Sequence, residues 1–269
     1  MGNNDSSKSS FQHVTIPRQE KILEIVNQAG NLSISFLANK LNVTEQTIRR
    51  DIRKLEEMNL ISRYHGGVIK VQQKGIVNKD FSERELSFVK EKEAIAKEVA
   101  DLIPENSTVF ITIGTTVEKI AAVLAYKKNL RVITDSLRVA ALLYRYSNIE
   151  VLVPSGVIRS SNGGIEGPQA IADLSEFRAD FAITSIGAID IDGTLLDFNL
   201  SEVMAAKTMI NNAKNLIIAC DHSKFTATAS VMLGNIKQAQ YLVTDSLPRE
   251  EIVSLLKENN VELIITKDD

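Results

Sequence analysis

The chain has 269 residues, a formal net charge of −3 at pH 7, three histidines and a single cysteine, Cys220. One cysteine excludes an internal disulfide, and the scattered histidines offer no zinc-ligand spacing, so we expect no bound metal or other cofactor. No stretch approaches the ~20 apolar residues of a membrane span, and residues 1–15 form a polar, disordered tail without the apolar centre of a signal peptide, so the sequence predicts a cytoplasmic protein.

The charge is unevenly divided along the chain. Residues 1–74 contain 11 Lys and Arg against 7 Asp and Glu, whereas the rest contains 20 against 27. Attraction to phosphate depends on the local patch and not on the chain total, so the acidic whole does not argue against nucleic acid. We expect a basic DNA-binding domain over residues 16–72 and an acidic body that faces away from DNA.

Three helices are predicted in the basic part. Apolar residues recur at helical spacing over residues 19–29, and a second helix over residues 34–41 precedes a tight turn. In the third helix, Ile48, Ile52 and Leu55 fall on one face. Helix, helix, tight turn and helix is the order of a helix-turn-helix.

The third helix has the features of a DNA-recognition helix. Thr44 is expected to cap it, which leaves side chains rich in hydrogen-bond donors facing outward. Residues 60–64 and 68–71 then predict two short strands about Gly66-Gly67, the wing of a winged helix. The alternative, a solvated basic surface helix, is disfavoured because three elements and a wing follow in order. The residues expected to contact DNA are Thr44, Gln46, Thr47, Arg49, Arg50, Arg53, Arg63 and His65.

A polar, aperiodic stretch over residues 73–83 predicts an interdomain linker. Residues 84–269 predict an effector-sensing and oligomerisation domain that begins with one helix over residues 84–104. Strands and helices then alternate, which predicts an α/β fold with a largely parallel sheet covered on both faces. Strands are expected at residues 108–113, 131–134, 150–153, 181–186, 215–220, 241–243 and 262–266, and helices at 117–125, 136–144, 202–213 and 249–259.

Polar residues follow several predicted strands, and ligands of parallel sheets bind at these carboxyl ends. The first strand leads through Gly114-Thr115-Thr116 into a helix, so backbone N–H groups, two hydroxyls and a helix N-terminus converge where an anion can bind. Each such motif alone is often only a cap or a turn, but together they predict a mouth for an anionic small molecule. The Gly-rich loop at residues 162–167 could close over it. Other strand ends contribute Asp135, Ser136, Gly156, Arg159, Gly187, Asp221 and Lys224.

Five motifs in order resemble those of the DeoR family of bacterial transcriptional regulators, over about residues 17–266. They are Thr47-Ile48-Arg49-Arg50-Asp51, His65-Gly66-Gly67, Gly114-Thr115-Thr116, Glu202 with Lys207, and Asp221-x-Ser223-Lys224-Phe225. The resemblance implies an N-terminal winged helix-turn-helix and a C-terminal α/β sensor domain similar to ribose-5-phosphate isomerase. It also implies an effector that is a sugar or polyol phosphate or a sulfosugar, and it adds Glu202 and Lys207 to the expected effector-binding residues.

Within the family, the sequence is most similar to regulators of glycerol 3-phosphate and sulfoquinovose utilisation. Three positions depart from the family pattern: Thr112 stands where many members have Asp, Asp135 where many have Asn, and Ser155 where many have Gly. Thr112 removes a carboxylate near the anion loop, and Asp135 restores one elsewhere. The hydroxyl pattern of the effector therefore cannot be transferred from a typical member.

Two classes of function remain. The first is a ligand-controlled repressor that binds the operator DNA of a carbohydrate-catabolism operon. The second is a sugar-phosphate isomerase-like enzyme, in which Glu202, Asp221 and Lys224 could act as base and acid. A fused recognition helix favours the regulator, because fold similarity alone does not transfer activity, so no catalytic residue is expected. Since one winged helix reads only a short half-site, we expect a homodimer or homotetramer.

Overall fold

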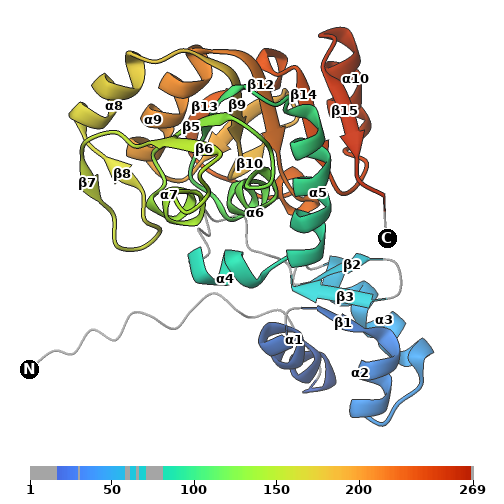
Figure 1. The fold of residues 1–269 in the computed structure, drawn as a ribbon. Helices are drawn as coiled ribbons and strands as arrows, with labels where there is room; N and C mark the ends of the chain where they lie inside the picture. The colour runs from blue at the N-terminus through green and yellow to red at the C-terminus, as the bar shows by residue number, and fades with distance from the viewer. Residues whose placement is uncertain (1–16, 30, 58–60, 65–66, 71–80, 268–269) are drawn as a thin grey trace, which may run out of the picture. The chain divides into compact units, whose positions relative to one another are not determined.

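The structure, a computed structural model, describes residues 17–29, 31–57, 61–64, 67–70 and 81–267 (Figure 1). Its contacts divide the chain into unit 1, Met1–Gly75, and unit 2, Ile76–Asp269. The predicted tail, His65 and the predicted linker up to residue 80 lie outside the described residues.

Unit 1 combines three helices with a small antiparallel sheet. Its elements are α1 (Pro17–Ala29), β1 (Asn31–Ser33), α2 (Ile34–Lys40), α3 (Glu45–Glu57), β2 (Ile61–Tyr64) and β3 (Gly67–Lys70). The sheet order is β1-β3-β2, so a strand that the sequence pattern did not predict extends the wing. Three residues are too few to show an alternating pattern, and β1 forms by pairing with β3. The predicted winged helix-turn-helix is confirmed.

The apolar stripe of α3 forms much of the core of unit 1. Ile48, Ile52 and Leu55 are 0% exposed and belong to one cluster with apolar residues of α1, α2 and β3. Complete burial of each such side chain contributes roughly 1.5–3 kcal/mol. Because one face of α3 is held in this core, its polar face is directed outward.

Unit 2 is built on a seven-stranded sheet (Figure 1). The strands of unit 2, in this sheet and in two smaller ones, are β4 (Thr108–Ile111), β5 (Leu130–Thr134), β6 (Ile149–Leu152), β7 (Val157–Ile158), β8 (Ile165–Glu166), β9 (Ala179–Thr184), β10 (Ala188–Ile189), β11 (Thr194–Asp197), β12 (Ala213–Ala219), β13 (Val231–Asn235), β14 (Tyr241–Thr244) and β15 (Glu262–Ile265). Its helices are α4 (Phe81–Leu86), α5 (Val89–Leu102), α6 (Thr115–Leu124), α7 (Leu137–Leu143), α8 (Pro168–Ser175), α9 (Leu200–Asn211), α10 (Glu250–Glu258) and the short 3-10 helices η1 (His222–Phe225) and η2 (Ile236–Gln238). The sheet order is β15-β14-β12-β9-β4-β5-β6 with every neighbouring pair parallel, which confirms the predicted α/β fold.

Helices cover both faces of this sheet (Figure 1). On β4, Phe110 packs in the cluster that contains residues of α8, α9 and α10, whereas Val109 and Ile111 pack in the cluster that contains residues of α5, α6 and α7. Successive strand residues point to opposite faces, so a strand between two helix layers is apolar throughout. This explains the uninterrupted apolar run from which β4 was predicted.

One predicted helix is divided in two. Periodicity predicted a single helix over residues 84–104, but α4 and α5 are separated at Phe88, which has a left-handed φ of 53°. The ammonium of Lys92 donates to the carbonyl oxygen of Ser87 at 2.7 Å and to that of Arg84. The carbonyl oxygen of Arg84 also accepts from the N–H of Ser87 at 3.3 Å, so the Lys92 ammonium adds a donor to the carbonyl groups at the end of α4. A side chain on the next helix therefore stabilises a break that helical periodicity does not reveal.

Several short elements were also missed from the sequence. They are α8, the hairpin of β7 and β8, and the antiparallel sheet β10-β11-β13, and α4 itself begins at Phe81, inside the predicted linker. A two-residue strand has no period, and it exists because a partner strand pairs with it. Of the helices in the described ranges, none is both long and apolar enough to cross a membrane.

Candidate functional site

The polar face of α3 is presented to solvent in unit 1. The exposed side chains include those of Gln46, Arg49, Arg50 and Arg53, together with Glu45 and Lys54. Thr44 caps the helix: its Oγ1 accepts a hydrogen bond from the N–H of Thr47 at 3.3 Å and lies 2.9 Å from the Thr47 hydroxyl. Of the other predicted DNA-binding residues, Arg63 is described only as part of the backbone of β2, and His65 lies outside the described residues.

The arginines of α3 differ in their partners. Nη2 of Arg49 lies 3.4 Å from Oε2 of Glu45, an exposed pair one helical turn apart. Arg50 and Arg53 form no ion pair with any residue that the structure describes. Arg50 and Arg53 are therefore available to an anionic partner without first breaking a contact.

Asp51 holds α3 against α1. Its carboxylate is 3% exposed; Oδ2 accepts from Nε of Arg18 at 2.6 Å, and Oδ1 accepts from Nε2 of Gln19 at 3.2 Å. A buried carboxylate requires such partners to offset its desolvation. The aspartate of the Thr47–Asp51 motif is therefore a positioning residue that orients the recognition helix.

In unit 2, the loop after β4 and the first turn of α6 form the predicted anion loop. Gly114 has φ of 153°, and a Cβ at this position would lie 3.3 Å from Cβ of Ser185, so glycine suits it on both counts. Thr115 and Thr116 follow directly and are buried. The first N–H groups of a helix lack partners within the helix and carry partial positive charge, which favours an anion here.

Two adjoining pockets lie at this loop. The anion pocket encloses about 410 Å³, including its open mouth, and is lined by Arg84, Ile113, Gly114, Thr115, Thr116, Ser185, Ile186, Asp197, Glu202, Asp221 and Lys224. The inner pocket encloses about 280 Å³ and is lined by Thr112, Ile113, Asp135, Thr184, Ser185, Asp197, Glu202, Val203, Ala206 and Leu233. Because four lining residues are shared, the two pockets form one continuous site. Seven of the predicted effector-binding residues line it.

Two cations line the anion pocket. Nε of Arg84 is buried and has no hydrogen-bond acceptor in the described part of the chain. Lys224 likewise forms no ion pair with a described residue. Asp221, although buried nearby, is engaged as the cap of η1, since its Oδ1 accepts from the N–H of Ser223 at 3.1 Å. The cationic groups thus remain available to a bound anion.

Glu202 lies at the junction of the two pockets. Its Oε1 accepts from Nδ2 of Asn162 at 2.9 Å and lies 3.6 Å from Nη1 of Arg159. Burial raises the pKa of Glu202, and the bond from Asn162 partly opposes that change. The side chain is therefore held in one orientation through Oε1, and no hydrogen bond from a described residue to Oε2 is seen.

Asp135 is the buried acid of the inner pocket. It is 1% exposed, and its Oδ1 accepts no hydrogen bond from a described residue. Burial, together with the nearby charges of Glu202 and Glu166, raises the pKa of Asp135 to about 8. At neutral pH the carboxyl group is therefore mainly protonated, and it can donate a hydrogen bond to a ligand oxygen as well as accept one.

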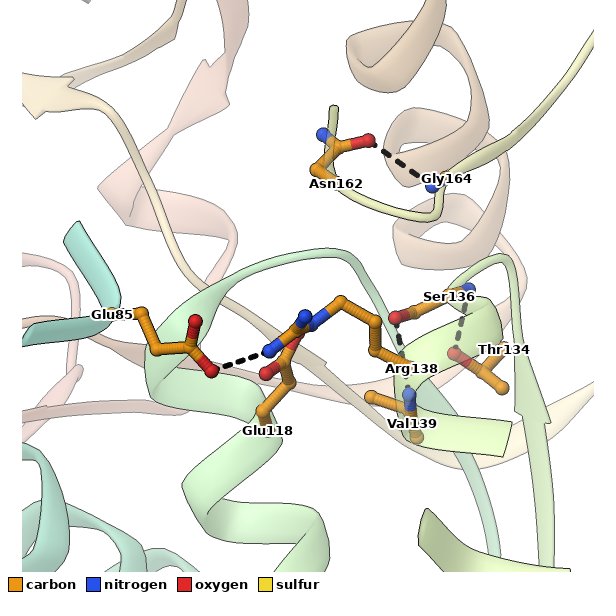
Figure 2. Close-up of polar contacts among 8 residues, drawn as sticks. All are labelled: Glu85, Glu118, Thr134, Ser136, Arg138, Val139, Asn162 and Gly164. Atoms are coloured by element: carbon orange, nitrogen blue, oxygen red, sulfur yellow. Dashed lines mark hydrogen bonds and ion pairs between the residues drawn. The ribbon is translucent and has the colours of Figure 1, made fainter. Parts of the chain in front are cut away.

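Five predicted effector-binding residues lie outside the lining of both pockets: Ser136, Gly156, Arg159, Gly187 and Lys207. Ser136 caps α7, since its hydroxyl accepts from a first-turn N–H at 3.2 Å (Figure 2). The two glycines permit close packing; a Cβ at Gly156 would lie 2.6 Å from the carbonyl oxygen of Glu166. Arg159 meets the lining only through Glu202, and Lys207 is half-buried on α9.

The Gly-rich loop, expected to close over a ligand, is tied down beside the inner pocket. Oδ1 of Asn162 accepts from the N–H of Gly164 at 3.1 Å (Figure 2). The N–H of Ile165 donates to the carbonyl oxygen of Asp135 at 2.7 Å. The loop therefore positions Asp135 through its backbone and Glu202 through Asn162.

Sequence reasoning missed several polar residues that line this site, among them Ser185, Asp197 and Arg84. Ser185 fell inside the strand predicted at residues 181–186, but β9 ends at Thr184, so Ser185 stands at a strand end that the pattern placed two residues too late. Asp197 ends β11, a strand without a readable pattern, and burial raises its pKa. Arg84 was predicted only as the start of a helix, and no local signal places it near the anion loop.

Comparison with known proteins identifies matches over both units. Residues 18–74 match the family described as DeoR-like helix-turn-helix domain, and residues 87–246 match the DeoR C terminal sensor domain. The HTH-type transcriptional repressor CsqR of Escherichia coli (strain K12) is 46% identical over 94% of this chain and 96% of its own length. The glycerol-3-phosphate regulon repressor of Haemophilus influenzae is 40% identical over 92% of this chain and 96% of its own length. Ribose 5 phosphate isomerase A from Neisseria gonorrhoeae overlaps 53% of this chain and 54% of its own at a TM-score of 0.38 and 18% identity.

These relatives decide between the two expected classes of function. Those similar over nearly the whole chain are named as repressors and not as enzymes, which favours the regulator over the isomerase. The two matched ranges, residues 18–74 and 87–246, contain all five motifs from which the family was first inferred. The chain therefore belongs to the DeoR family of DNA-binding transcriptional repressors.

Proposed function

We propose that the protein acts in the cytoplasm as the repressor of a carbohydrate-catabolism operon, and that a sugar or polyol carrying a phosphate or sulfonate group controls its binding to the operator. The observation that carries this proposal is the polarity of the continuous site in unit 2. Its outer part presents Lys224 and the N-terminus of α6. Its inner part presents hydroxyl and carboxyl groups, including Asp135 and Glu202.

Each part of such a ligand has matching groups. The anion accepts hydrogen bonds from the N–H groups and hydroxyls of Gly114, Thr115 and Thr116 and is neutralised by Lys224. The hydroxyl groups reach Glu202, which accepts, and Asp135, which can donate. Charged and uncharged sugars are thereby distinguished, because only a charged sugar neutralises the cations that line the outer part.

Thr115→Val is expected to remove the response to the effector and to leave operator affinity near that of the wild type. The substitution keeps the size of a side chain that is 9% exposed but deletes a hydroxyl of the anion pocket. The effector itself is first identified by thermal-shift measurements with sugar phosphates, glycerol 3-phosphate and sulfosugars, since a ligand of the folded state raises its stability. Uncharged sugars are the negative controls and should not raise the melting temperature.

Thr208→Val provides the matched control. Thr208 lies on α9, and its hydroxyl donates to the carbonyl oxygen of Met204 at 3.0 Å outside the pocket. This variant should retain the ligand-induced shift. A Thr115→Val protein with a normal response would show that the anion loop is only a helix cap, and a chain that no anionic sugar stabilises would contradict the proposed function.

The repressor is also proposed to bind its operator as a homodimer or homotetramer held by unit 2. One winged helix contacts only a short half-site, so specificity requires at least two on one DNA. Unit 2 leaves apolar side chains at its surface, with Val157 75% and Leu200 64% exposed. Light scattering should give at least a dimer for the full chain and for residues 76–269 at micromolar concentration. A monomeric fragment would place self-association elsewhere.

A further inference from the structure

Helix α4 is the first element of unit 2, and it directly follows the sequence that joins the two units. It packs against α6, the helix whose first turn forms the anion loop. From α4, Arg84 reaches the lining of the anion pocket. Helix α4, the first described helix of unit 2, thus contributes a side chain to the pocket.

Few side chains hold α4 in place. Phe81 is 7% exposed, and the guanidinium carbon of Arg138 lies 4.9 Å from the centre of its ring. The same guanidinium group pairs with Glu85 of α4 at 2.5 Å and with Glu118 of α6 at 2.8 Å (Figure 2). One arginine therefore links α4 to α6 from α7. Both ion pairs are partly exposed, so each contributes little to the docking of α4.

Arg84 is partly buried, and its Nε atom is the unsatisfied group of this arrangement. Its guanidinium carbon lies 5.4 Å from the centre of the Phe81 ring, while its Nε, buried, has no acceptor among the residues that the structure describes. A buried charged donor carries a desolvation cost that a bond to a protein group normally offsets. Lys224 of η1 lines the same pocket. Two cations that lie far apart in the sequence therefore line one pocket.

We propose that Arg84 is an anion-binding residue of this pocket, and that its bond to the phosphate or sulfonate of the effector fixes α4 against α6. This inference rests on the proposed function and identifies α4 as the helix whose position depends on the bound ligand. The contact exists only while α4 is docked, so the ligand has a higher affinity for the docked state and shifts the chain towards it. By linkage, anything that displaces α4 lowers ligand affinity by the same factor. Operator binding can change because α4 continues the sequence that leads from the DNA-binding unit.

Titration of the full chain with inorganic phosphate, at constant ionic strength set with chloride, tests this inference. Arg84→Met should weaken phosphate binding about tenfold or more, since it removes a charge-assisted hydrogen bond to the anion. Arg131→Met is the matched control, because Arg131 is exposed and pairs with Glu150 away from the pocket. Arg84→Lys, which keeps the charge but lacks Nε, should lose an intermediate amount and serves as the test if Arg84→Met fails to fold.

Amide hydrogen exchange separates this inference from the proposed function. In the wild type, phosphate should slow amide exchange both in the first turn of α6 and in residues 81–88. In Arg84→Met at saturating phosphate, it should slow exchange only in the first turn of α6. Equal protection of residues 81–88 in both proteins, or unchanged phosphate affinity in Arg84→Met and Arg84→Lys, would overturn the role of Arg84 and leave the anion loop intact. Absence of phosphate protection at the first turn of α6 in the wild type would overturn the proposed function itself.

Discussion

Arg50→Ala is expected to weaken operator binding by ~1–3 kcal/mol, which corresponds to roughly 5- to 150-fold in affinity. Arg50 is exposed on α3, whose opposite face is fixed in the core by Ile48 and Ile52. Arg49 must exchange its contact with Glu45 for any contact with DNA, but Arg50 forms no ion pair with a described residue. We therefore expect Arg50 to make the larger net contribution.

Titrations with an operator duplex and a scrambled duplex at fixed salt separate two roles of Arg50. A residue that reads a base edge loses affinity only on the operator, whereas one that contacts phosphate loses similar affinity on both and lowers the salt dependence. Arg131→Ala in unit 2, which breaks an exposed pair with Glu150, should leave both affinities unchanged. Unchanged affinity of Arg50→Ala on both duplexes would remove this residue from the interface.

Asp135→Asn is expected to stabilise the protein increasingly as the pH rises. The pKa of Asp135 is raised from 3.8 to about 8 in the folded protein, chiefly by burial. Between these values the unfolded chain releases a proton that the folded chain retains, so wild-type stability falls with pH by about 1.4 kcal/mol per pH unit from this group alone. Asparagine has a similar shape and cannot ionise. The free energy of unfolding of the variant therefore does not fall in this way, and from pH 5 to pH 8 it should rise by several kcal/mol relative to that of the wild type.

Urea unfolding followed by circular dichroism from pH 5 to pH 8 measures this effect as the difference in unfolding free energy between variant and wild type. Asp180→Asn is the control, since the bond from Lys214 lowers the pKa of Asp180 and the carboxylate is charged throughout this range. Its difference from the wild type should therefore stay constant with pH. A constant difference for Asp135→Asn as well would show that Asp135 is ionised in the folded protein.

Local periodicity was sufficient to predict the main elements, and adjacent residues were sufficient to predict one candidate anion loop. The stripe of Ile48, Ile52 and Leu55 repeats within a few residues, so it identified α3 and the face of that helix that is exposed. The anion loop could be recognised for the same reason, because Gly114, Thr115 and the start of α6 are adjacent in the chain. Where a functional group depends on neighbours in the sequence, its role follows from the sequence.

The composition of the candidate effector site depended on the tertiary structure. Arg84, Asp135 and Glu202 come from three separate elements, and the sheet and its helices bring them to one cavity. The charge state of Asp135 is a property of burial and of neighbouring carboxylates, neither of which is encoded by the residues beside it. The break before α5 likewise depends on Lys92, whose ammonium satisfies the end of α4. Sequence patterns report local conformational preference, whereas desolvation and long-range contacts exist only once the chain has folded, and these determine which polar groups remain available to bind a ligand.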